Sequence, residues 1–315
     1  MKKAFMIAGS LILLGAIVFF CALAAANWKF KNLSAADYET HVTKISEDFN
    51  EISISTRTAN IAFAASEDGE CRVECYEDKK ETHAVAVENG ALTVKIGVRK
   101  AWHYYIGFDF EEPKITVYLP KTQFSALRIE SSTGSVEISK DYTFERADIS
   151  LTTGDVHFGA AISEALKIKT TTGNIGVDGV FCGAADLSST TGNLIVSGAT
   201  CGGDFAVNVS TGNAHLTNVT CENLISDGST GDLALKNVVS KNKISVERST
   251  GNVTFIGCDA AEIYVKTSTG DVTGSLLSGK SFVTDTSTGE VNMPASSGGK
   301  CEIKTSTGDI KISVR

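Results

Sequence analysis

The sequence is poor in proline, with only three in 315 residues. Because 42% of the residues are hydrophobic, this scarcity excludes a disordered, proline-rich stalk and favours a folded chain. Basic residues are also a minority: once residues 1–31 are set aside, 25 basic and 37 acidic residues remain. The phosphates of nucleic acid would be repelled by this acidic balance, so we expect no nucleic-acid partner.

Charge is absent from Ala4 to Ala26. An apolar stretch of this length can cross a bilayer as a helix, whereas the apolar core of a cleavable signal is usually shorter. We therefore expect residues 1–28 to be a transmembrane anchor with a short N-terminus, although small residues around Ala24 leave cleavage open. Lysines flank the stretch on both sides. We place the short N-terminus inside, which gives a single-pass cell-membrane protein with an extracytoplasmic C-terminal domain.

A Thr-Gly pair recurs every 19 or 20 residues along the second part of the chain. Its glycines are Gly134, Gly154, Gly173, Gly192, Gly212, Gly231, Gly251, Gly270, Gly289 and Gly308. Apolar or small side chains recur seven and five residues before each glycine, as at Leu127 and Ile129, and two and four residues after it, as at Val136 and Ile138. Such alternation indicates half-buried strands. Charged residues such as Arg128, Asp148 and Lys167 lie between and are expected to face solvent.

A unit of about 20 residues cannot bury its own apolar face, but stacked units share one core. The repeat therefore predicts an all-β protein, a parallel β-helix or solenoid of about ten coils, over residues 119–315. The glycine is expected to provide a turn with positive φ, and the Asn or Asp after it to bond nearby backbone. Residues 50–118 are predicted to be degenerate coils or a β cap, and residues 29–49 a juxtamembrane linker.

Two passages resemble a known bacterial family: Ile115-Thr116-Val117-Tyr118-Leu119-Pro120, and Leu127-Arg128-Ile129-Glu130-Ser131-Ser132-Thr133-Gly134. They are similar to the putative-adhesin, LiaG-like β-strand-repeat proteins, and the resemblance covers roughly residues 50–315. It implies a β-helical extracytoplasmic domain, often membrane-anchored and often encoded near cell-envelope-stress regulators. It implies no catalytic residues.

Cysteines and charged residues are the candidate chemical groups. Cys182, Cys201 and Cys221 each lie nine residues past a repeat glycine and should stack on adjacent coils, as a ladder of small residues, a disulfide or a soft-metal site; we favour the ladder. Cys71 and Cys75 are too far apart along one strand for a disulfide. Lys266, Asp285 and Lys304 are expected on successive coils in that order, as a charge ladder.

The sequence contains no nucleophile–base pair, phosphate-binding loop or metal motif that we can identify, so we expect no catalytic, cofactor-binding or metal-binding residues. The candidate partner surface is the aromatic cluster of Trp102, Tyr104, Tyr105 and Phe108, for which core packing in the cap is the competing interpretation. The last coil, ending at Arg315, is a second candidate surface because we expect nothing to cover it.

The resulting hypothesis is a non-catalytic, membrane-anchored envelope protein that contacts a membrane signalling protein or a cell-wall component, as an interaction or stress-signalling accessory. Two alternatives stay open. One is a carbohydrate-active β-helix enzyme, and the other is a passive structural spacer.

Overall fold

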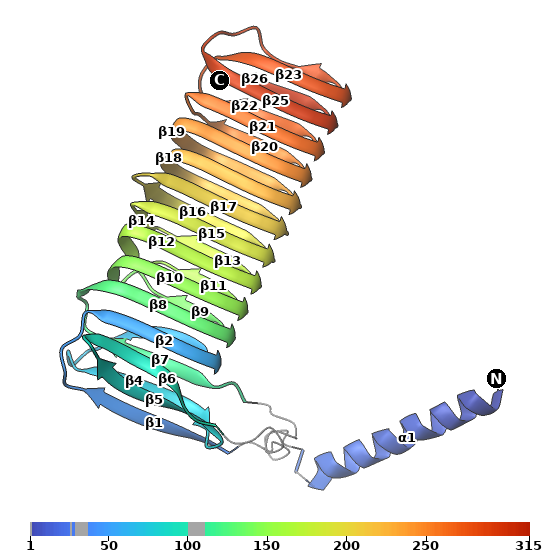
Figure 1. Cartoon of the computed structure of the whole chain (residues 1–315). Helices are drawn as coiled ribbons and strands as arrows, with labels where there is room; N and C mark the ends of the chain where they lie inside the picture. The colour runs from blue at the N-terminus through green and yellow to red at the C-terminus, as the bar shows by residue number, and fades with distance from the viewer. Residues whose placement is uncertain (1, 26, 29–36, 100–110) are drawn as a thin grey trace.

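The computed structural model describes residues 2–25, 27–28, 37–99 and 111–315. Near the N-terminus, α1 (Lys2–Ala25) is an uninterrupted helix. Its segment Phe5–Ala25 is long and apolar enough to cross a membrane, and almost all of it is exposed; a signal sequence would have the same properties. The rest of the described chain is β-structure (Figure 1).

The strands form two walls that face each other across a shared core. We call the first the long-strand wall. In spatial order its strands are β5 (Glu81–Glu88), β6 (Ala91–Arg99), β2 (Glu51–Thr58), β8 (Gln123–Thr133), β10 (Thr143–Thr153), β12 (Ala161–Thr172), β15 (Ala184–Thr191), β17 (Asp204–Thr211), the second parts of β18 (Ala214–Thr230) and β19 (Leu233–Thr250), β21 (Glu262–Thr269), β25 (Gly299–Thr307) and β23 (Lys280–Thr288).

The opposite wall is the short-strand wall. In spatial order its strands are β1 (Tyr38–Ile45), β4 (Cys71–Asp78), β7 (Lys114–Leu119), β3 (Asn60–Ala65), β9 (Val136–Ile138), β11 (Val156–Phe158), β13 (Ile175–Asp178), β16 (Leu194–Cys201), the first parts of β18 and β19, β20 (Val253–Cys258), β22 (Val272–Leu276), β26 (Ile310–Val314) and β24 (Val291–Asn292). The two-residue strand β14 (Phe181–Cys182) pairs with the end of β16.

Within each coil, a tight corner carries the chain from the long-strand wall to the short-strand wall. Strands of neighbouring coils pair in parallel and in register, which confirms the predicted parallel solenoid. The repeat glycines have φ between 126° and 152°, a conformation that other residues rarely adopt. A Cβ atom on Gly154 would also overlap the carbonyl oxygen of Gly134 in the adjacent coil. Glycine is therefore required twice, by its φ and by the close approach of the next corner.

The Asn or Asp after the glycine also connects coils. The predicted bond to nearby backbone is a bond to the next coil: the Asn193 side-chain oxygen accepts from the backbone N–H of Asn213, and the Asn174 oxygen accepts from the N–H of Asn193. The same link, at 2.6–3.4 Å, runs from Asn60 at one end of the column to Glu290 at the other. One side-chain oxygen per coil thus satisfies a turn N–H that the strand ladders leave free.

The core is one continuous apolar cluster from Ile52 to Ile312. The predicted inward positions are buried, as at Leu127 and Ile244, and the predicted outward charges are exposed. Three residues before the glycine, a column of small side chains also points inward. Arg248 interrupts this column with only 4% exposure, and it fits because Gly228 in the adjacent coil has no side chain there. Its guanidinium donates to the carbonyl oxygen of Gly231 at 3.1 Å, and burial lowers its pKa.

At the C-terminal end, spatial order departs from chain order. β25 pairs with both β21 and β23, so the last coil (β25 and β26) lies between the two coils that precede it in sequence (Figure 1). The exposed tip of the described chain is β23 and β24, where Val283 and Val291 are 51% and 48% exposed. The prediction that the coil ending at Arg315 is uncovered is therefore wrong. Its sequence pattern is that of every other coil, so nothing in it revealed the exchange.

This exchange also changes the order of the predicted charge ladder. The neighbours are Lys266 and Lys304, followed by Asp285, rather than three alternating charges. Lys304 pairs instead with Glu302 of its own strand, at 2.6 Å. The outermost coil is held by Lys280, whose buried ammonium lies 2.6 Å from Asp259.

The N-terminal end is also exchanged and is closed by antiparallel strands. β2 and β3 form a coil that lies between the β8–β9 coil and the outermost pair, β6 and β7 (Figure 1). β5 then adds antiparallel to β6, and β4 and β1 add antiparallel beyond β7. Residues 50–118 thus contain both a coil and a cap. Within residues 29–49, expected to be linker, Tyr38–Ile45 form β1 of this cap.

Candidate functional site in the cap

The predicted partner surface, Trp102, Tyr104, Tyr105 and Phe108, lies outside the described residues. Its two flanks are described: β6 ends at Arg99 and β7 begins at Lys114. In the repeat coils, the connection between the two walls is the tight glycine corner. In this outermost coil, residues 100–113 take the place of that corner.

The far end of this insertion is attached to the corner edge of the cap. The Tyr38 hydroxyl donates to the carbonyl oxygen of Glu111 at 3.2 Å, and the Asn60 side-chain amide donates to Glu112 at 2.7 Å. A hollow of about 470 Å³ borders this edge and is lined by Tyr38, Pro113 and Gly134, among others. The insertion therefore rejoins the fold next to the column of glycine corners.

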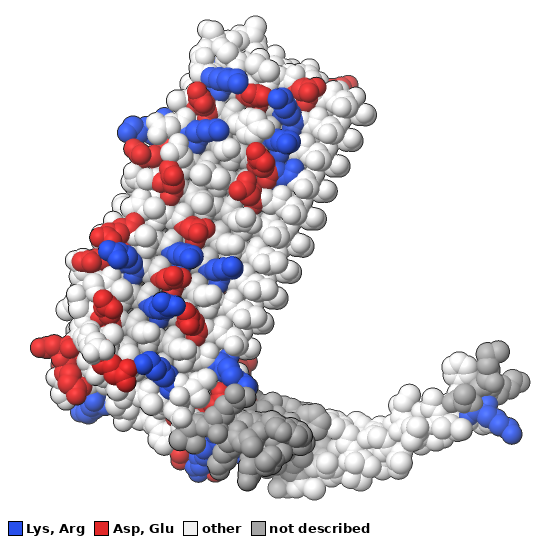
Figure 2. All heavy atoms as spheres, in the orientation of Figure 1, with Lys and Arg blue, Asp and Glu red and all other residues white. Residues whose placement is uncertain are grey.

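The exposed side chains of the two walls favour sheet stability and solubility rather than catalysis. Charged side chains of both signs gather on one broad face (Figure 2), while the glycine corners carry only acidic charges, from Asp155, Asp232, Asp271, Glu290 and Asp309. Arg128, Asp148, Lys167 and Asp186 occupy the same register on four successive coils, with alternating sign. Opposite charges on neighbouring strands stabilise a sheet modestly.

The cysteine ladder is present as predicted. Cys182 and Cys201 are in-register partners, Cys221 follows on the next coil, and all three are buried free thiols. The hydrogen bond with Cys201 and burial raise the pKa of Cys182, and burial raises the pKa of Cys221 to about 11. The hydrogen bond with Cys182 lowers the pKa of Cys201 to about 7, so Cys182 and Cys221 stay protonated at neutral pH and Cys201 is the most acidic thiol of the ladder.

A buried polar cluster inside the cap is the most unusual chemical feature of the described chain. Cys75 and Glu77 lie two residues apart on β4, so both point to the interior from the short-strand wall. His83 reaches them from β5 on the long-strand wall. One extra residue in β6, Gly97, shifts the pairing between Thr82 and His83, and a β-bulge of this kind re-aims the side chain beside it.

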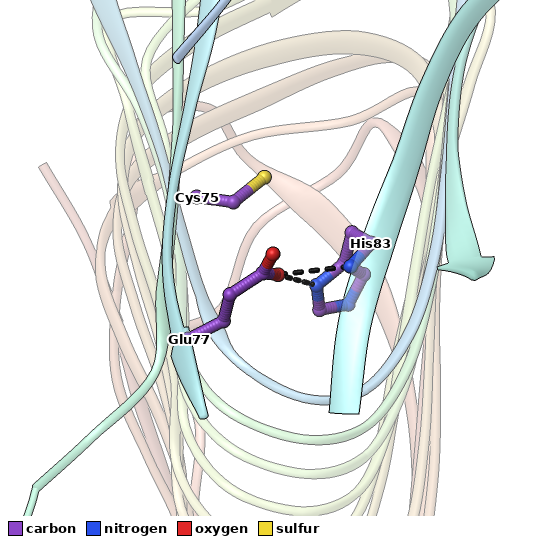
Figure 3. A group of neighbouring side chains, drawn as sticks. All are labelled: Cys75, Glu77 and His83. Carbon is purple, nitrogen blue, oxygen red and sulfur yellow. Dashed lines mark hydrogen bonds and ion pairs between the residues drawn. The ribbon is translucent and has the colours of Figure 1, made fainter. Parts of the chain in front are cut away.

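Short hydrogen bonds join Glu77 and His83, and the sulfur of Cys75 lies beside them (Figure 3). The His83 Nδ1 atom lies 2.6 Å from Glu77 Oε2, and the backbone N–H of His83 donates to the same oxygen at 2.9 Å. On the other side of the ring, Nε2 lies 2.7 Å from the hydroxyl of Thr56 on β2. The possible ligand atoms of Cys75, Glu77 and His83 all lie within 4.8 Å of one another.

Burial of the cluster is nearly complete. The side chains of Glu77 and His83 are 2% and 3% exposed, and Cys75 is 2% exposed. Burial, together with the nearby charge of Glu77, raises the pKa of the Cys75 thiol to about 12. Although Glu77 Oε2 accepts two hydrogen bonds, its Oε1 atom is buried without a partner. A buried carboxylate oxygen of this kind is costly and calls for an explanation.

The order Thr56–His83–Glu77 has the connectivity of a hydroxyl nucleophile, a base and an orienting acid. Thr56 is only 6% exposed, however, and its hydroxyl faces the interior of the cap. A polymeric substrate could not reach it without opening the core, so nucleophilic catalysis does not fit this geometry.

This cluster is not among the sites predicted from the sequence. One signal was present: the alternation of β4 puts Glu77 on the same side as Val73 and Cys75, and a carboxylate on the apolar side of a strand is unusual. No signal marked His83 as its partner, because β4 and β5 are consecutive in sequence but join opposite walls.

A family model described as Toastrack DUF4097 matches residues 49–204 and 240–315. Among solved structures, a "putative lipid binding protein" from Parabacteroides distasonis ATCC 8503 is 15% identical, with a TM-score of 0.52, over 88% of this chain and 97% of that one. A "putative adhesin" from Bacteroides fragilis NCTC 9343 is 17% identical, with a TM-score of 0.45, over 88% and 97% of the two chains. These identities bear on the fold alone. The comparison with curated proteins returns no match.

Proposed function

The chain belongs to the Toastrack DUF4097 family, and on that premise we propose that it is a non-catalytic envelope protein, anchored by α1, that binds a partner through its cap. The resemblance to putative adhesins noted in the sequence is confirmed by this family and by the names of similar structures. The two similar structures named above are called a putative adhesin and a putative lipid binding protein, and neither is named as an enzyme. The partner, the orientation and the role in stress signalling are our proposals.

One observation carries the proposal: the tight corner is replaced by the aromatic insertion in the outermost coil of the cap. The repeat coils need only Thr-Gly and one polar residue to pass from wall to wall. Residues 100–113, with their dense aromatic cluster, are far longer than that geometry requires. Aromatic side chains are favoured at the centre of protein interfaces. We therefore assign Trp102, Tyr104, Tyr105 and Phe108 to partner binding.

The position of the cap favours a membrane protein over a cell-wall component as the partner. α1 ends at Ala25 and β1, in the cap, begins at Tyr38. The intervening residues 26–37 reach at most about 40 Å when fully extended. If α1 spans the membrane, the cap is the tethered end and the β23–β24 tip the distal one. A surface on the cap then lies within reach of other membrane proteins.

The test uses the full chain in its native membrane. In-cell crosslinking followed by affinity capture would compare the wild type with a variant in which Trp102, Tyr104, Tyr105 and Phe108 are all alanine. Capture of a specific membrane protein should fall at least roughly tenfold in this variant, because truncation of interface anchors costs about 2 kcal/mol or more. The matched control is Val283→Ala with Val291→Ala, which removes exposed apolar side chains from the tip.

Four outcomes would contradict the proposal. Equal capture by both variants would place the interface elsewhere, and loss only in the tip control would move it to β23 and β24. No specific partner in any sample would favour the passive spacer. Turnover of peptidoglycan or another polysaccharide by the purified chain, abolished by changing one outward carboxylate, would favour the enzyme instead.

A further inference from the structure

The unpartnered oxygen of Glu77 points to a ligand inside the cap. The side chain of Glu77 is only 2% exposed. Its Oε1 atom has no hydrogen-bond partner, although Oε2 has two. Oε1 points toward the side of the cluster where the sulfur of Cys75 lies (Figure 3). The Cys75 thiol, the Glu77 carboxylate and the His83 imidazole therefore point into one buried volume. A metal cation between them could accept an electron pair from each.

We propose that Cys75, Glu77 and His83 bind a zinc ion that joins the two walls of the cap. The donor atoms are one thiolate sulfur, one carboxylate oxygen and one imidazole nitrogen, which together suit Zn²⁺. Their mutual separations of at most 4.8 Å are those of ligands that could close on one ion with small side-chain movements. A water molecule would complete a tetrahedral set.

The surroundings of His83 have the form expected around a metal-binding histidine. On binding the ion, Nδ1 would give up its hydrogen bond to Glu77 Oε2 and its lone pair would bind the metal; the ring proton would then lie on Nε2, 2.7 Å from the Thr56 hydroxyl, and donate to it. Such a donor contact fixes the tautomer and the ring orientation of a ligand histidine. The backbone N–H of His83 likewise holds the Glu77 carboxylate. Thr56 is in this view a positioning residue that does not touch the ion.

The charge of the ligands and a cavity beside His83 both suit a divalent cation. On binding, Cys75 loses its proton to solvent and forms a sulfur–zinc bond, so that thiolate and carboxylate together balance the two positive charges of the ion. A cavity of about 170 Å³ borders His83 and is also lined by Tyr38, Asp78 and Glu81. It offers a short path from the surface to the imidazole.

The effect of the ion would be structural. β4 is hydrogen-bonded to β1 and β7, and β5 to β6, so the two walls meet at this point through side chains. A zinc ion held by β4 and β5 would join the two walls inside the cap, at the N-terminal end of the solenoid. Its binding free energy would then add to the stability of the cap.

The test measures metal binding by the purified full chain in detergent after treatment with a chelator. When Zn²⁺ is added back and the excess is removed by desalting, the zinc content should be one ion per chain, and Co²⁺ added in its place as a probe should give a thiolate-to-cobalt absorption band. Cys75→Ser should abolish that band, and His83→Gln and Glu77→Gln should weaken binding at least roughly a hundredfold. Thr56→Val should weaken it by about ten- to a hundredfold while the band remains.

Two matched controls separate this site from other thiols. Cys71→Ser changes a half-buried cysteine on the same strand, and Cys201→Ser breaks the thiol ladder of the stack. Both should keep the zinc ion and the cobalt band. Circular dichroism establishes that each variant is folded. The absorption spectrum of the Co²⁺-bound wild type reports sulfur ligation without any substitution.

The proposal is overturned if the wild type binds no zinc or gives no sulfur-to-cobalt band. It is equally overturned if Cys201→Ser loses the band and Cys75→Ser keeps it. Zinc that binds but leaves the melting temperature unchanged would contradict the structural role. None of these results depends on whether the aromatic insertion binds a partner.

Discussion

The regular stack and the two ends of the solenoid differ in whether coils that are neighbours in sequence are also neighbours in space. From β8 to β22, each coil lies on the one before it in sequence. At both ends, a coil is placed between two others: β2 and β3 at one end, β25 and β26 at the other. In each case an internal position in the stack is filled out of chain order, and strands from a neighbouring segment form the outer edge.

The prolines mark the same division. Pro113 and Pro120 flank β7 in the cap, and Pro294 follows β24 at the exchanged tip. None lies between them in the regular stack. Within the stack, backbone N–H groups are used by neighbouring coils on both sides, and proline would remove one of them. Pro113, Pro120 and Pro294 all lie in connections outside the strands, where no such ladder is needed and proline is tolerated. In this chain, a long segment without proline therefore marks the regular stack, and the prolines mark the two ends.

The largest expected effect distinguishes the exchanged order from the sequential one. Paired cysteines at Lys266 and Lys304 should be joined efficiently by oxidation or a short bifunctional thiol reagent, because these residues are in-register neighbours about 4.8 Å apart. Cysteines at Lys266 and Asp285 lie two coils apart, about 10 Å, and should not be joined. Mass spectrometry of linked peptides measures the yield.

The pair Asp285 and Lys304 is the positive control, since these positions are neighbours in either order. Efficient joining of positions 266 and 285, with none between 266 and 304, would restore the sequential stack. The β23–β24 edge would then no longer be the tip.

A second prediction sharpens what the stack requires of its corner. Gly212→Ala should destabilise the chain by about 3 kcal/mol or more, because the residue has φ of 140° and its new Cβ would overlap the carbonyl oxygen of Gly192. Gly179→Ala, with φ of 65° and open space, should cost about 1 kcal/mol. Gly202→Ala should cost under about 0.5 kcal/mol.

Urea unfolding of the full chain in detergent, followed by circular dichroism, gives these three values. The order Gly212, Gly179, Gly202 is the expected result. If Gly212→Ala proved as mild as Gly202→Ala, the corners would not be closely stacked, and the columns inferred for the whole solenoid would be in doubt.

The smallest expected effect concerns the side-chain column beside the glycines. Asn193→Ala removes the acceptor for the backbone N–H of Asn213. Since this edge is exposed, water can replace the lost partner, and the expected cost is about 0.5–1 kcal/mol. Asn208→Ala, an exposed outward position on β17, should be neutral by the same unfolding measurement. Equal costs for the two would show that the column adds nothing to stability.

The fold of the stack was predictable because every coil repeats the same pattern of apolar, polar and glycine positions. The inward positions, the corner glycines and the cysteine register all follow from a period of 19 or 20 residues, and the structure places them as expected. The cluster of Cys75, Glu77 and His83 was not predictable. It depends on antiparallel strands that occur once, on a bulge at Gly97, and on two consecutive strands joining opposite walls.

The amino-acid sequence by itself determined the parallel coil, its core and its corners, because alternation along a strand and one glycine per turn admit few other arrangements. Only the tertiary structure decided which coil lies at each end and which side chains meet in the cap. Identical corners fit any neighbour equally well, so the repeat cannot specify order. Long-range packing of the non-repeating segments has to do so.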